Sequence, residues 1–445
     1  MVGEREDTIF ALSTPRGKSG VAVIRISGTG ALDALRTLGI YDEISPRMAT
    51  CKILRDSSGH PIDQAVVLYF PAPGSFTGED VIELQVHGSI AVIRRLYDML
   101  HTVIRIANPG EFSLRAYLNG KIDLTMAEGI SDLINAETEA QLRQAVAQST
   151  GSLKRQYSSW RNMLIDIISS LEACIDFPED VDSSKVLGGI YGGISQFREN
   201  LALYLDDNHR GEILRNGIRV VILGEPNAGK STLFNSLARR NAAIVSAQPG
   251  TTRDVLEVAI DIDGYPFVIV DTAGIRDSSD SIEQEGIRRA LNAAEHADVK
   301  IVMCPYGTVF QESIDAISSP HDERTVWVLS KADNSSESGP VMLHGRKFHP
   351  ISVHRDIGVS TLLQLIKEKS ENSFPGTEDV CITSHRHRSH LQKALQFLSA
   401  ITHDMPVEIL AEHLRLASQE IGRVTGVVYG DDILNDIFSK FCIGK

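Results

Sequence analysis

Long hydrophobic runs are absent from this sequence, and no uninterrupted apolar stretch approaches the ~20 residues that a transmembrane helix needs. The start, MVGEREDTIF, carries acids where a secretory signal carries a basic region and an apolar stretch. Five cysteines are scattered without any C-x-x-C pair, which argues against both a disulfide framework and a zinc site. We therefore expect a cytoplasmic protein that does not span a membrane.

Positive charge is also scarce, because 44 Lys and Arg face 58 Asp and Glu and leave a net charge of −14. Nucleic-acid affinity rests largely on Lys and Arg that neutralise phosphates, so this balance opposes a chain-wide phosphate-binding surface. An RNA substrate would have to bind at a local basic patch or with the help of a partner. The apolar share of 42% and the charged share of 23% are those of ordinary globular domains.

The pattern of residues changes twice along the chain. The first part is of mixed α/β character, with β-rich runs at Val21–Ile26, Asp63–Phe70 and Val81–His87 and one helix at Ile90–His101. Helical spacing then predicts helices at Thr125–Gln148 with a bend near Gly151, along apolar residues from Tyr157 to Ile175, and at Ile194–Leu214. The glycine-rich LGGIYGG at 187–193 is interpreted as a loop, with glycines of a packed helix as the alternative.

From Gly217 the pattern alternates strand and helix, which indicates a parallel-sheet domain. Helices return after Gly376, with Val407 to Ile421 on one helix and Ile433–Phe441 on the last. We expect an α/β and α multidomain protein: an α+β domain at 1–121, a discontinuous helical domain at 122–216 plus 378–445, and an inserted Ras-like P-loop domain at 217–377.

A phosphate-binding loop follows the apolar run Ile218–Leu223 directly. Residues 224–231 read GEPNAGKS, which is G-x-x-x-x-G-K-S between a predicted strand and a predicted helix. Glycines let the backbone N–H groups turn toward the phosphates, at the N-terminus of the helix. We expect Lys230 to reach the β- and γ-phosphates and the Ser231 hydroxyl to bind Mg²⁺.

Two further motifs follow in the order expected of a GTPase. GTTRD at 250–254 stands at the distance of a switch loop, where Thr252 can bind Mg²⁺. A predicted hairpin, Val255–Asp261 and Phe267–Val270 around Asp263-Gly264, then leads to DTAG at 271–274, with Asp271 on the magnesium side. Three motifs in order are far more specific than any one of them.

The water-activating position departs from the Ras pattern, because Ile275 stands where a glutamine orients the attacking water. Isoleucine cannot polarise water, so another residue must do so. Glu283 and Glu285 just downstream are the candidates, although by themselves they are better explained as solvated charges on a helix face.

The base-recognition motif is imperfect, since Ser330-Lys331-Ala332-Asp333 stands where Asn-Lys-x-Asp is expected. Asp333 can accept hydrogen bonds from guanine N1 and N2, and the Lys331 stem can cover the ring. One lost hydrogen bond is worth about 0.5–1.5 kcal/mol, so guanine specificity should survive in a weaker form. Ile351-Ser352-Val353 replaces the usual Ser-Ala, a milder change because backbone groups dominate there.

Motifs at both ends of the chain narrow the family. They are TPRGKSG at 14–20, VIRISG at 23–28, SFTGEDVIELQVHG at 75–88, PGEF at 109–112, RAYLNGKIDL at 115–124 and CIGK at 442–445. Together with the GTPase motifs, they closely resemble the MnmE (TrmE) family of tRNA modification GTPases over essentially the whole length. The conjunction is highly specific.

The resemblance implies a homodimer whose N-terminal domain dimerises and binds a tetrahydrofolate derivative, 5-formyl- or methylene-tetrahydrofolate. It implies a flavin-dependent partner, MnmG, which carries the FAD, and a tRNA substrate. The two proteins would add an aminomethyl or carboxymethylaminomethyl group at C5 of the wobble uridine. It also implies GTP hydrolysis stimulated by K⁺, which dimerising G domains enclose beside the phosphates.

The resemblance also assigns residues. Asn227, Ser246, Gln248 and Thr251 would bind K⁺, and Glu283 would orient the attacking water. Ser246 and Gln248 differ from the commoner threonine and isoleucine. The full set of expected GTP-binding residues is Asn227, Ala228, Gly229, Lys230, Ser231, Thr232, Ser246, Ala247, Gln248, Pro249, Gly250, Thr251, Thr252, Asp271, Thr272, Ala273, Gly274, Lys331 and Asp333.

The expected folate-binding residues are Arg25, Glu83, Lys121 and Lys445. A carboxylate at Glu83 can accept two hydrogens from the amino-pyrimidine face of a pterin, although Glu83 can equally pair with Arg25. Cys442 is the thiol most suited to catalysis, near Lys445, or else a small apolar residue that closes the last helix. Three histidines at 385, 387 and 390 are better explained by a helix face than by a metal ion.

Two other functions compete with this interpretation. The first is a ribosome-assembly or other switch GTPase without one-carbon chemistry, which predicts a basic RNA-binding appendage that this sequence does not show. The second is a folate-dependent one-carbon transferase that GTP merely regulates. The N-terminal motifs and the CIGK end favour the tRNA-modifying function.

Overall fold

The computed structural model describes the chain at 7–176, 183–224, 227–240, 256–271, 293–307, 322–333, 339–370, 381–427, 434, 437–439 and 441–445. The chain divides into two compact units. The first holds Met1–Ser131, Gln148–Glu172 and Ala411–Lys445, and the second holds Asp132–Ala147 and Ala173–Leu410. The division into three domains at 121, 216 and 377 stays a prediction. No helix in the described ranges has both the length and the apolarity to cross a membrane.

A six-stranded sheet of order β3-β4-β5-β2-β1-β6 organises the N-terminal part. The three predicted strands are confirmed as β2 (Ser19–Ser27), β4 (Pro61–Phe70) and β5 (Val81–Gly88). Sequence reasoning missed β1 (Ile9–Leu12), β3 (Thr50–Arg55) and the short β6 (Arg105–Ile106). All neighbouring strands are antiparallel except β1 and β6, which run parallel.

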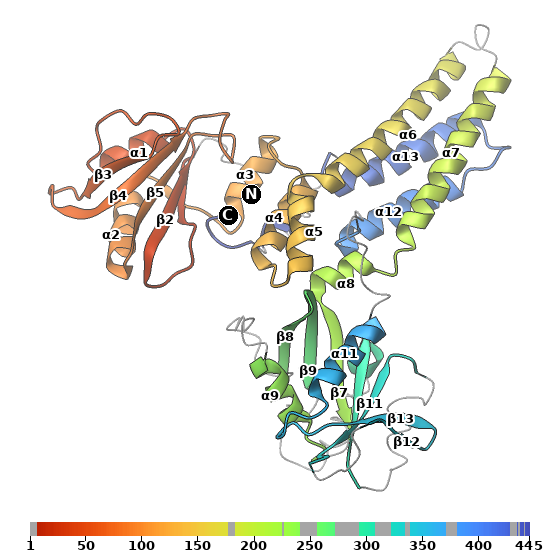
Figure 1. Cartoon of the computed structure of the whole chain (residues 1–445). Coiled ribbons are helices and arrows are strands. Elements are labelled where there is room, and N and C mark those ends of the chain that lie inside the picture. Colours follow the sequence, from red (N-terminus) through yellow and green to blue (C-terminus); the bar gives the residue numbers. More distant parts are fainter. Residues whose placement is uncertain are drawn as a thin grey trace, which may run out of the picture. The chain divides into compact units, whose positions relative to one another are not determined.

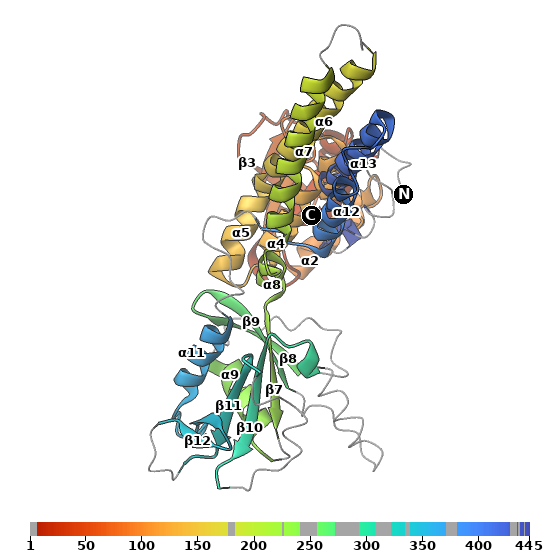
Figure 2. The same cartoon turned by 90° about the vertical axis from the view of Figure 1, so that its right-hand side faces the viewer.

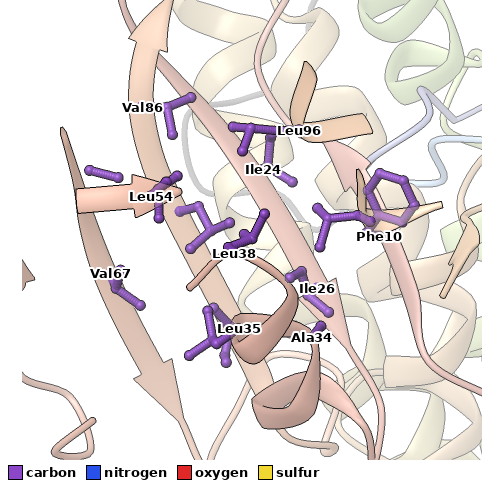
Figure 3. Packing of buried hydrophobic residues seen from close by; sticks show 14 of the residues in the cluster. Phe10, Ile24, Ile26, Ala34, Leu35, Leu38, Leu54, Val67, Val86 and Leu96 are labelled. Atoms are coloured by element: carbon purple, nitrogen blue, oxygen red, sulfur yellow. The ribbon is translucent and has the colours of Figure 1, made fainter. Parts of the chain in front are cut away.

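Two helices cover one face of this sheet, α1 (Ala31–Thr37) and the predicted helix, confirmed as α2 (Ile90–Leu100). Figure 3 shows Leu35 of the first helix, Leu38 directly after it and Leu96 of the second among strand residues such as Ile24 and Leu54. All five side chains are at most 2% exposed. Alternation along each strand sends one set of side chains into this core, and the other set remains available for a polar surface.

The helix predicted over Thr125–Gln148 is wrong, because two helices lie there, α4 (Leu124–Asn135) and α5 (Glu139–Ser149). A capping box separates them. The Thr138 hydroxyl accepts a hydrogen bond from the Gln141 amide at 3.4 Å, and the Gln141 side-chain oxygen accepts one from the Thr138 amide at 3.2 Å. This reciprocal pair satisfies two amides that lack helical partners and starts a new helix. The predicted bend at Gly151, whose φ is +89°, precedes α6.

The long helix predicted from Tyr157 to Ile175 is confirmed as α6 (Ser152–Asp176), and the helix from Val407 is confirmed as α13 (Val407–Thr425). Arg415 on α13 pairs with Glu172 on α6 at 2.7 Å. Helix α3 (Glu111–Leu118) precedes this part of the chain. For the last predicted helix, the described residues 434 and 437–439 are helical.

The loop predicted at 187–193 is wrong, because these residues belong to α7 (Ser183–Leu205). The helix predicted at Ile194–Leu214 is wrong for the same reason, since α7 begins earlier and ends at Leu205. Ile190, Ile194, Phe197 and Leu201 are all at most 5% exposed and recur at helical spacing. Helix α7 packs against α12 (His385–Ser399), and Figures 1 and 2 show the two side by side. Burial of this stripe outweighs the roughly 1 kcal/mol that each glycine costs a helix.

Gly192 offers a direct test of the cost that glycine imposes on α7. A Cβ built at Gly192 meets no heavy atom within 4 Å, whereas one at Gly211 meets the Ile382 carbonyl oxygen at 2.4 Å. Gly192→Ala is therefore expected to raise the free energy of unfolding by about 0.5–1 kcal/mol, because it restricts the unfolded chain at no steric cost. Gly211→Ala should have the opposite effect and lower the free energy of unfolding, because its Cβ would clash with the Ile382 carbonyl. Urea unfolding gives the free energy of unfolding of both variants. A Gly192→Ala protein that is less stable than the natural chain would contradict the open space found at Gly192 in α7.

The second unit carries a seven-stranded sheet of order β12-β13-β11-β10-β7-β9-β8. Its strands are β7 (Ile218–Gly224), β8 (Leu256–Ile262), β9 (Tyr265–Asp271), β10 (Val299–Pro305), β11 (Thr325–Ser330), β12 (Val341–Leu343) and β13 (Arg346–Pro350). The central strands are parallel, and β8 pairs antiparallel with β9 as the predicted hairpin. Helices α9 (Lys230–Arg240) and α11 (Val359–Ser370) pack on it. The predicted P-loop fold class is confirmed.

Arg388 on α12 joins the two places where the chain enters and leaves this sheet domain. Its guanidinium donates to the Leu205 carbonyl at 2.9 Å, to Asp207 at 2.6 Å and to Glu212 at 2.8 Å. Glu212 lies on α8 (Arg210–Asn216), which leads into β7. The side chain of Arg388 is 4% exposed, so its charge depends on these three acceptors.

Candidate functional site

The predicted phosphate-binding loop connects β7 with α9. Gly224 ends β7 with φ +140°, and a Cβ there would lie 2.2 Å from the Met303 carbonyl oxygen, so only glycine fits. Asn227 and Gly229 also have positive φ values, +65° and +91°. Lys230, the first residue of α9, donates to the Gly224 carbonyl at 2.9 Å, which holds its ammonium group over the loop.

Asp271 lies at the carboxyl end of β9, beside that loop. The register pairs it with Ile222 on β7, two residues before Gly224, and with Leu256 on β8. Its side chain is fully buried. A hydroxyl at Ser231, which is exposed, and a carboxylate at Asp271 are the hard oxygen donors that Mg²⁺ prefers, so these residues fit that ion. Parallel strands with such residues at their carboxyl ends are typical of a nucleotide site.

The base-recognition segment follows β11, next to the phosphate loop. Ser330 is 3% exposed, and its hydroxyl donates to the carbonyl oxygen of Ala228 at 2.6 Å, with the Cys304 carbonyl 3.3 Å away. Lys331 is exposed with φ +58°. The Ser352 hydroxyl donates to the Asp333 carboxylate and accepts from the Arg355 amide at 3.2 Å. Asp333 is thus oriented by a residue whose role sequence reasoning did not identify.

Several predicted residues lie outside the described part of the chain. They are Ser246, Ala247, Gln248, Pro249, Gly250, Thr251, Thr252, Thr272, Ala273, Gly274 and the catalytic candidates Glu283 and Glu285. The same holds for Ile275. Of the predicted K⁺ ligands, only Asn227 is described, and its side chain is exposed.

A second polar cluster lies on the N-terminal sheet, where three of the four predicted folate-binding residues meet. Arg25 on β2 and Glu83 on β5 are directly opposite in the register, and Arg25 donates twice to one Glu83 oxygen, at 2.7 and 2.9 Å. Burial, followed by the positive charge of Arg25, lowers the pKa of Lys445, while Glu83 acts in the opposite sense. The side chains of Arg25 and Glu83 are 16% and 19% exposed, so a ligand can reach both.

Two aromatic rings flank this cluster and were not among the predicted site residues. The Arg25 guanidinium lies 5.9 Å from the ring centre of Phe76 and 5.8 Å from that of Phe112. Both belong to motifs that carry the family resemblance, SFTGED and PGEF, so the signal was present, but no role was predicted for either ring. Aromatic faces beside a guanidinium and a carboxylate suit a flat heterocycle with amino groups.

The C-terminal residues pack onto the same unit. Ser13 donates to the Gly444 carbonyl at 3.0 Å, and Pro109 forms a bridge with Ile443. Cys442 is free and exposed, as a reactive thiol must be. Lys121 is also exposed, and its ammonium donates to the Pro73 carbonyl at 2.9 Å, in the loop that carries Phe76.

The phosphate loop after β7, Asp271 beside it and the base segment after β11 together define a P-loop GTPase. The family follows from comparison with known proteins. The family model described as "GTP-binding protein TrmE N-terminus" matches residues 8–121, and that of the "MnmE helical domain" matches residues 124–442. This chain belongs to the MnmE family of tRNA modification GTPases.

Curated relatives match over the whole length. A tRNA modification GTPase MnmE of Anaplasma phagocytophilum is 69% identical over 100% of both chains, and one of Anaplasma marginale is 60% identical over 99% of this chain and 100% of its own. That of Ehrlichia chaffeensis is 52% identical over 98% of this chain and 100% of its own. Among solved structures, the G domain of the T. maritima FeoB iron transporter is 19% identical. It covers 34% of this chain and 98% of its own, with a TM-score of 0.25.

Proposed function

We propose that this GTPase acts with a flavin-dependent partner, MnmG, to add an aminomethyl or carboxymethylaminomethyl group at C5 of the wobble uridine of certain tRNAs. The FAD would belong to the partner, and the protein would act as a homodimer in the cytoplasm. The observation that carries the proposal is the presence of two separate sites on one chain of this family: a nucleotide site after β7, and the Arg25–Glu83 pair with its two rings on the N-terminal sheet.

The nucleotide site would bind GTP with Mg²⁺. Lys230 would neutralise charge on the β- and γ-phosphates, Ser231, Thr252 and Asp271 would serve Mg²⁺, and Asp333 would accept from guanine N1 and N2. Magnesium supplies charge neutralisation on the phosphates when it is bound. Glu283 would orient the attacking water, since Ile275 has no group that can do so.

The N-terminal cluster would bind a tetrahydrofolate derivative that supplies the one-carbon unit. One carboxylate oxygen of Glu83 accepts both hydrogen bonds from Arg25, and the other oxygen can accept from the amino-pyrimidine face of a pterin. Lys445 and Lys121 would favour the glutamate tail, because ammonium groups attract carboxylates. Cys442 is exposed at the same end of the chain and is the candidate nucleophile.

Potassium would complete the nucleotide site, bound by Asn227, Ser246, Gln248 and Thr251 when two G domains meet. A cation beside the phosphates stabilises the charge that develops in phosphoryl transfer, a role that an arginine finger fills in other GTPases. Asn227 fits such an ion, since its side-chain amide supplies an oxygen and is exposed next to the phosphate loop.

GTP hydrolysis should therefore be faster in KCl than in NaCl at equal ionic strength. Arginine fingers are worth about 10³–10⁵ in rate. A potassium ion carries the same charge but donates no hydrogen bonds, so we expect a smaller effect, of at least about tenfold. Asn227→Ala and Glu283→Ala should each remove most of the stimulation, because one loses an ion ligand and the other the water-orienting carboxylate.

Asn216→Ala is the matched control, because Asn216 is exposed at the end of α8, outside the nucleotide site. It should keep the full potassium response. Equal rates in the two salts for the natural chain would count against G-domain dimerisation around K⁺ and would leave only a GTPase of the family.

A further inference from the structure

Ser330 stands where a GTPase of this class normally carries asparagine, and its surroundings decide what the hydroxyl can do. A serine hydroxyl has one proton to donate and two lone pairs to accept with. Here the hydroxyl donates to the Ala228 carbonyl at 2.6 Å, and a second carbonyl oxygen, that of Cys304, lies 3.3 Å away. Both neighbours are acceptors, so the proton is committed to one of them.

Guanine presents N7 as a lone-pair acceptor without a proton. Only a donor can read it, and the Ser330 proton is already in use. Redirecting this proton would leave the Ala228 carbonyl, in a residue that is 0% exposed, without the hydroxyl, at the cost of a buried hydrogen bond. The Ser330 side chain is itself 3% exposed, so water cannot readily take over as the donor to that carbonyl.

The hydrogen bond has a second consequence, because its two ends belong to different loops. Ser330 begins the base-recognition segment, while Ala228 lies in the phosphate loop between Gly224 and Ser231. The backbone around Ser330 is held as well: its carbonyl accepts from the Tyr306 amide at 2.8 Å, and the Ala332 amide donates to Ile351 at 3.1 Å. The hydroxyl therefore links a firmly held segment to the loop that surrounds the phosphates.

We propose that Ser330 is a positioning residue that ties the base-recognition segment to the phosphate loop, and that the base subsite consequently does not read guanine N7. Discrimination among purines then rests on the edge that faces Asp333, whose carboxylate Ser352 orients. This inference rests on the proposed function, in which Asp333 accepts from guanine N1 and N2.

The first experiment needs no variant. Competition of GTP, 7-deaza-GTP and ATP against a fluorescent guanine nucleotide gives three dissociation constants for the full chain. GTP and 7-deaza-GTP should agree within about twofold, since no hydrogen bond is lost when N7 becomes a C–H. ATP should bind much more weakly, because it presents an acceptor at N1 to the Asp333 carboxylate. A 7-deaza-GTP that binds several-fold more weakly than GTP would overturn the inference.

Two variants of Ser330 test separately the absence of N7 recognition and the positioning role. Ser330→Asn supplies an amide donor and should create a preference for GTP over 7-deaza-GTP of about 2- to 12-fold. Ser330→Ala removes the link and should weaken both nucleotides by a similar factor while keeping them equal. Unchanged affinity in Ser330→Ala would overturn the positioning role. Ser360→Ala is the matched control, since Ser360 is exposed on α11, and it should bind as the natural chain does.

A third variant shows whether Asp333 binds the base at all, which separates an error in the proposed base site from an error in the inference about Ser330. Asp333→Asn should exchange guanine for xanthine, because an asparagine amide can donate to the xanthine 2-oxygen where the carboxylate accepted from the guanine 2-amino group. If this variant gains no affinity for xanthosine triphosphate, the base lies elsewhere, and both the base site and the inference fall. If it switches while the natural chain still discriminates against 7-deaza-GTP, the inference alone falls.

Discussion

Replacement of Arg115 by methionine is expected to lower the free energy of unfolding of the N-terminal unit by about 3–5 kcal/mol. Arg115 on α3 is 7% exposed and contacts three carboxylates: Asp7 at 2.6 Å, Glu79 at 3.1 Å and Glu111 at 3.1 Å. Methionine fills similar space, but it carries no charge. The three carboxylates, which are partly buried, would then lack the cation that they share. The cost comes from the charges left behind, more than from the attraction that is lost.

The matched control is Arg36→Met. Arg36 also pairs with a carboxylate, Asp33 at 2.8 Å, but the two side chains are 68% and 70% exposed. An exposed pair of this kind contributes about 0–1 kcal/mol, so the control should unfold almost as the natural chain does. Urea unfolding followed by circular dichroism measures both. Equal, small losses for the two variants would show that the Arg115 cluster does not stabilise the unit.

The same cluster should make stability depend on acid. Burial raises the pKa of Glu111 and of Asp7, but hydrogen bonds from Arg105 and Arg115 outweigh it, so both pKa values lie below the ordinary 4.5 and 3.8. A carboxyl whose folded pKa is depressed contributes stability that is fully present above its unfolded pKa and is lost as pH falls through the folded value. The natural chain should therefore lose stability below about pH 4.5, and Arg115→Met should lose less of it over the same range.

Replacement of Lys230 by alanine is expected to reduce the rate of GTP hydrolysis by about 10²- to 10³-fold, the size found when one preorganised electrostatic group is removed from an active site. Lys230 begins α9 and is held over the phosphate loop by its hydrogen bond to Gly224, so its charge is in place before the nucleotide arrives. A group that is already oriented costs no reorganisation during the reaction.

Single-turnover hydrolysis at saturating GTP separates this loss from weaker binding. Lys369→Ala is the control, because Lys369 is exposed in the last turn of α11, away from the loop, and it should keep its rate. A Lys230→Ala protein that binds GTP and hydrolyses it within tenfold of the natural rate would exclude the role assigned to this residue.

The errors in the predicted helices have identifiable physical causes. The break between α4 and α5 was visible in principle, because Thr138-Glu139-Ala140-Gln141 is a capping-box sequence, but the continuous helical spacing on either side concealed it. The glycines at 187–193 were interpreted as a loop from local propensity alone. Contact with α12 buries the stripe from Ile190 to Leu201 and overrides that propensity. That contact comes from a helix that begins only at His385, far along the chain.

The clusters that join distant residues were equally hidden. Arg115 and Asp7 are 108 residues apart, and Arg388 and Asp207 are 181 apart. No local pattern marks either arginine as buried, because a charged residue on a helix is exposed far more often than not. Their roles follow from the way strands and helices bring the partners together.

The sequence by itself determined the class of this protein, because the residues of a phosphate loop, GEPNAGKS, are contiguous and their chemistry depends on backbone geometry that those residues impose locally. Through its resemblance to the family, the sequence also predicted Arg25 and Glu83 as members of one folate-binding site. Tertiary structure alone decided that these two face each other at 2.7 Å between two aromatic rings, and that Ser330 bonds to Ala228 across 102 residues. Such pairings depend on strand register and packing, which are set by the whole fold and not by neighbours in the chain.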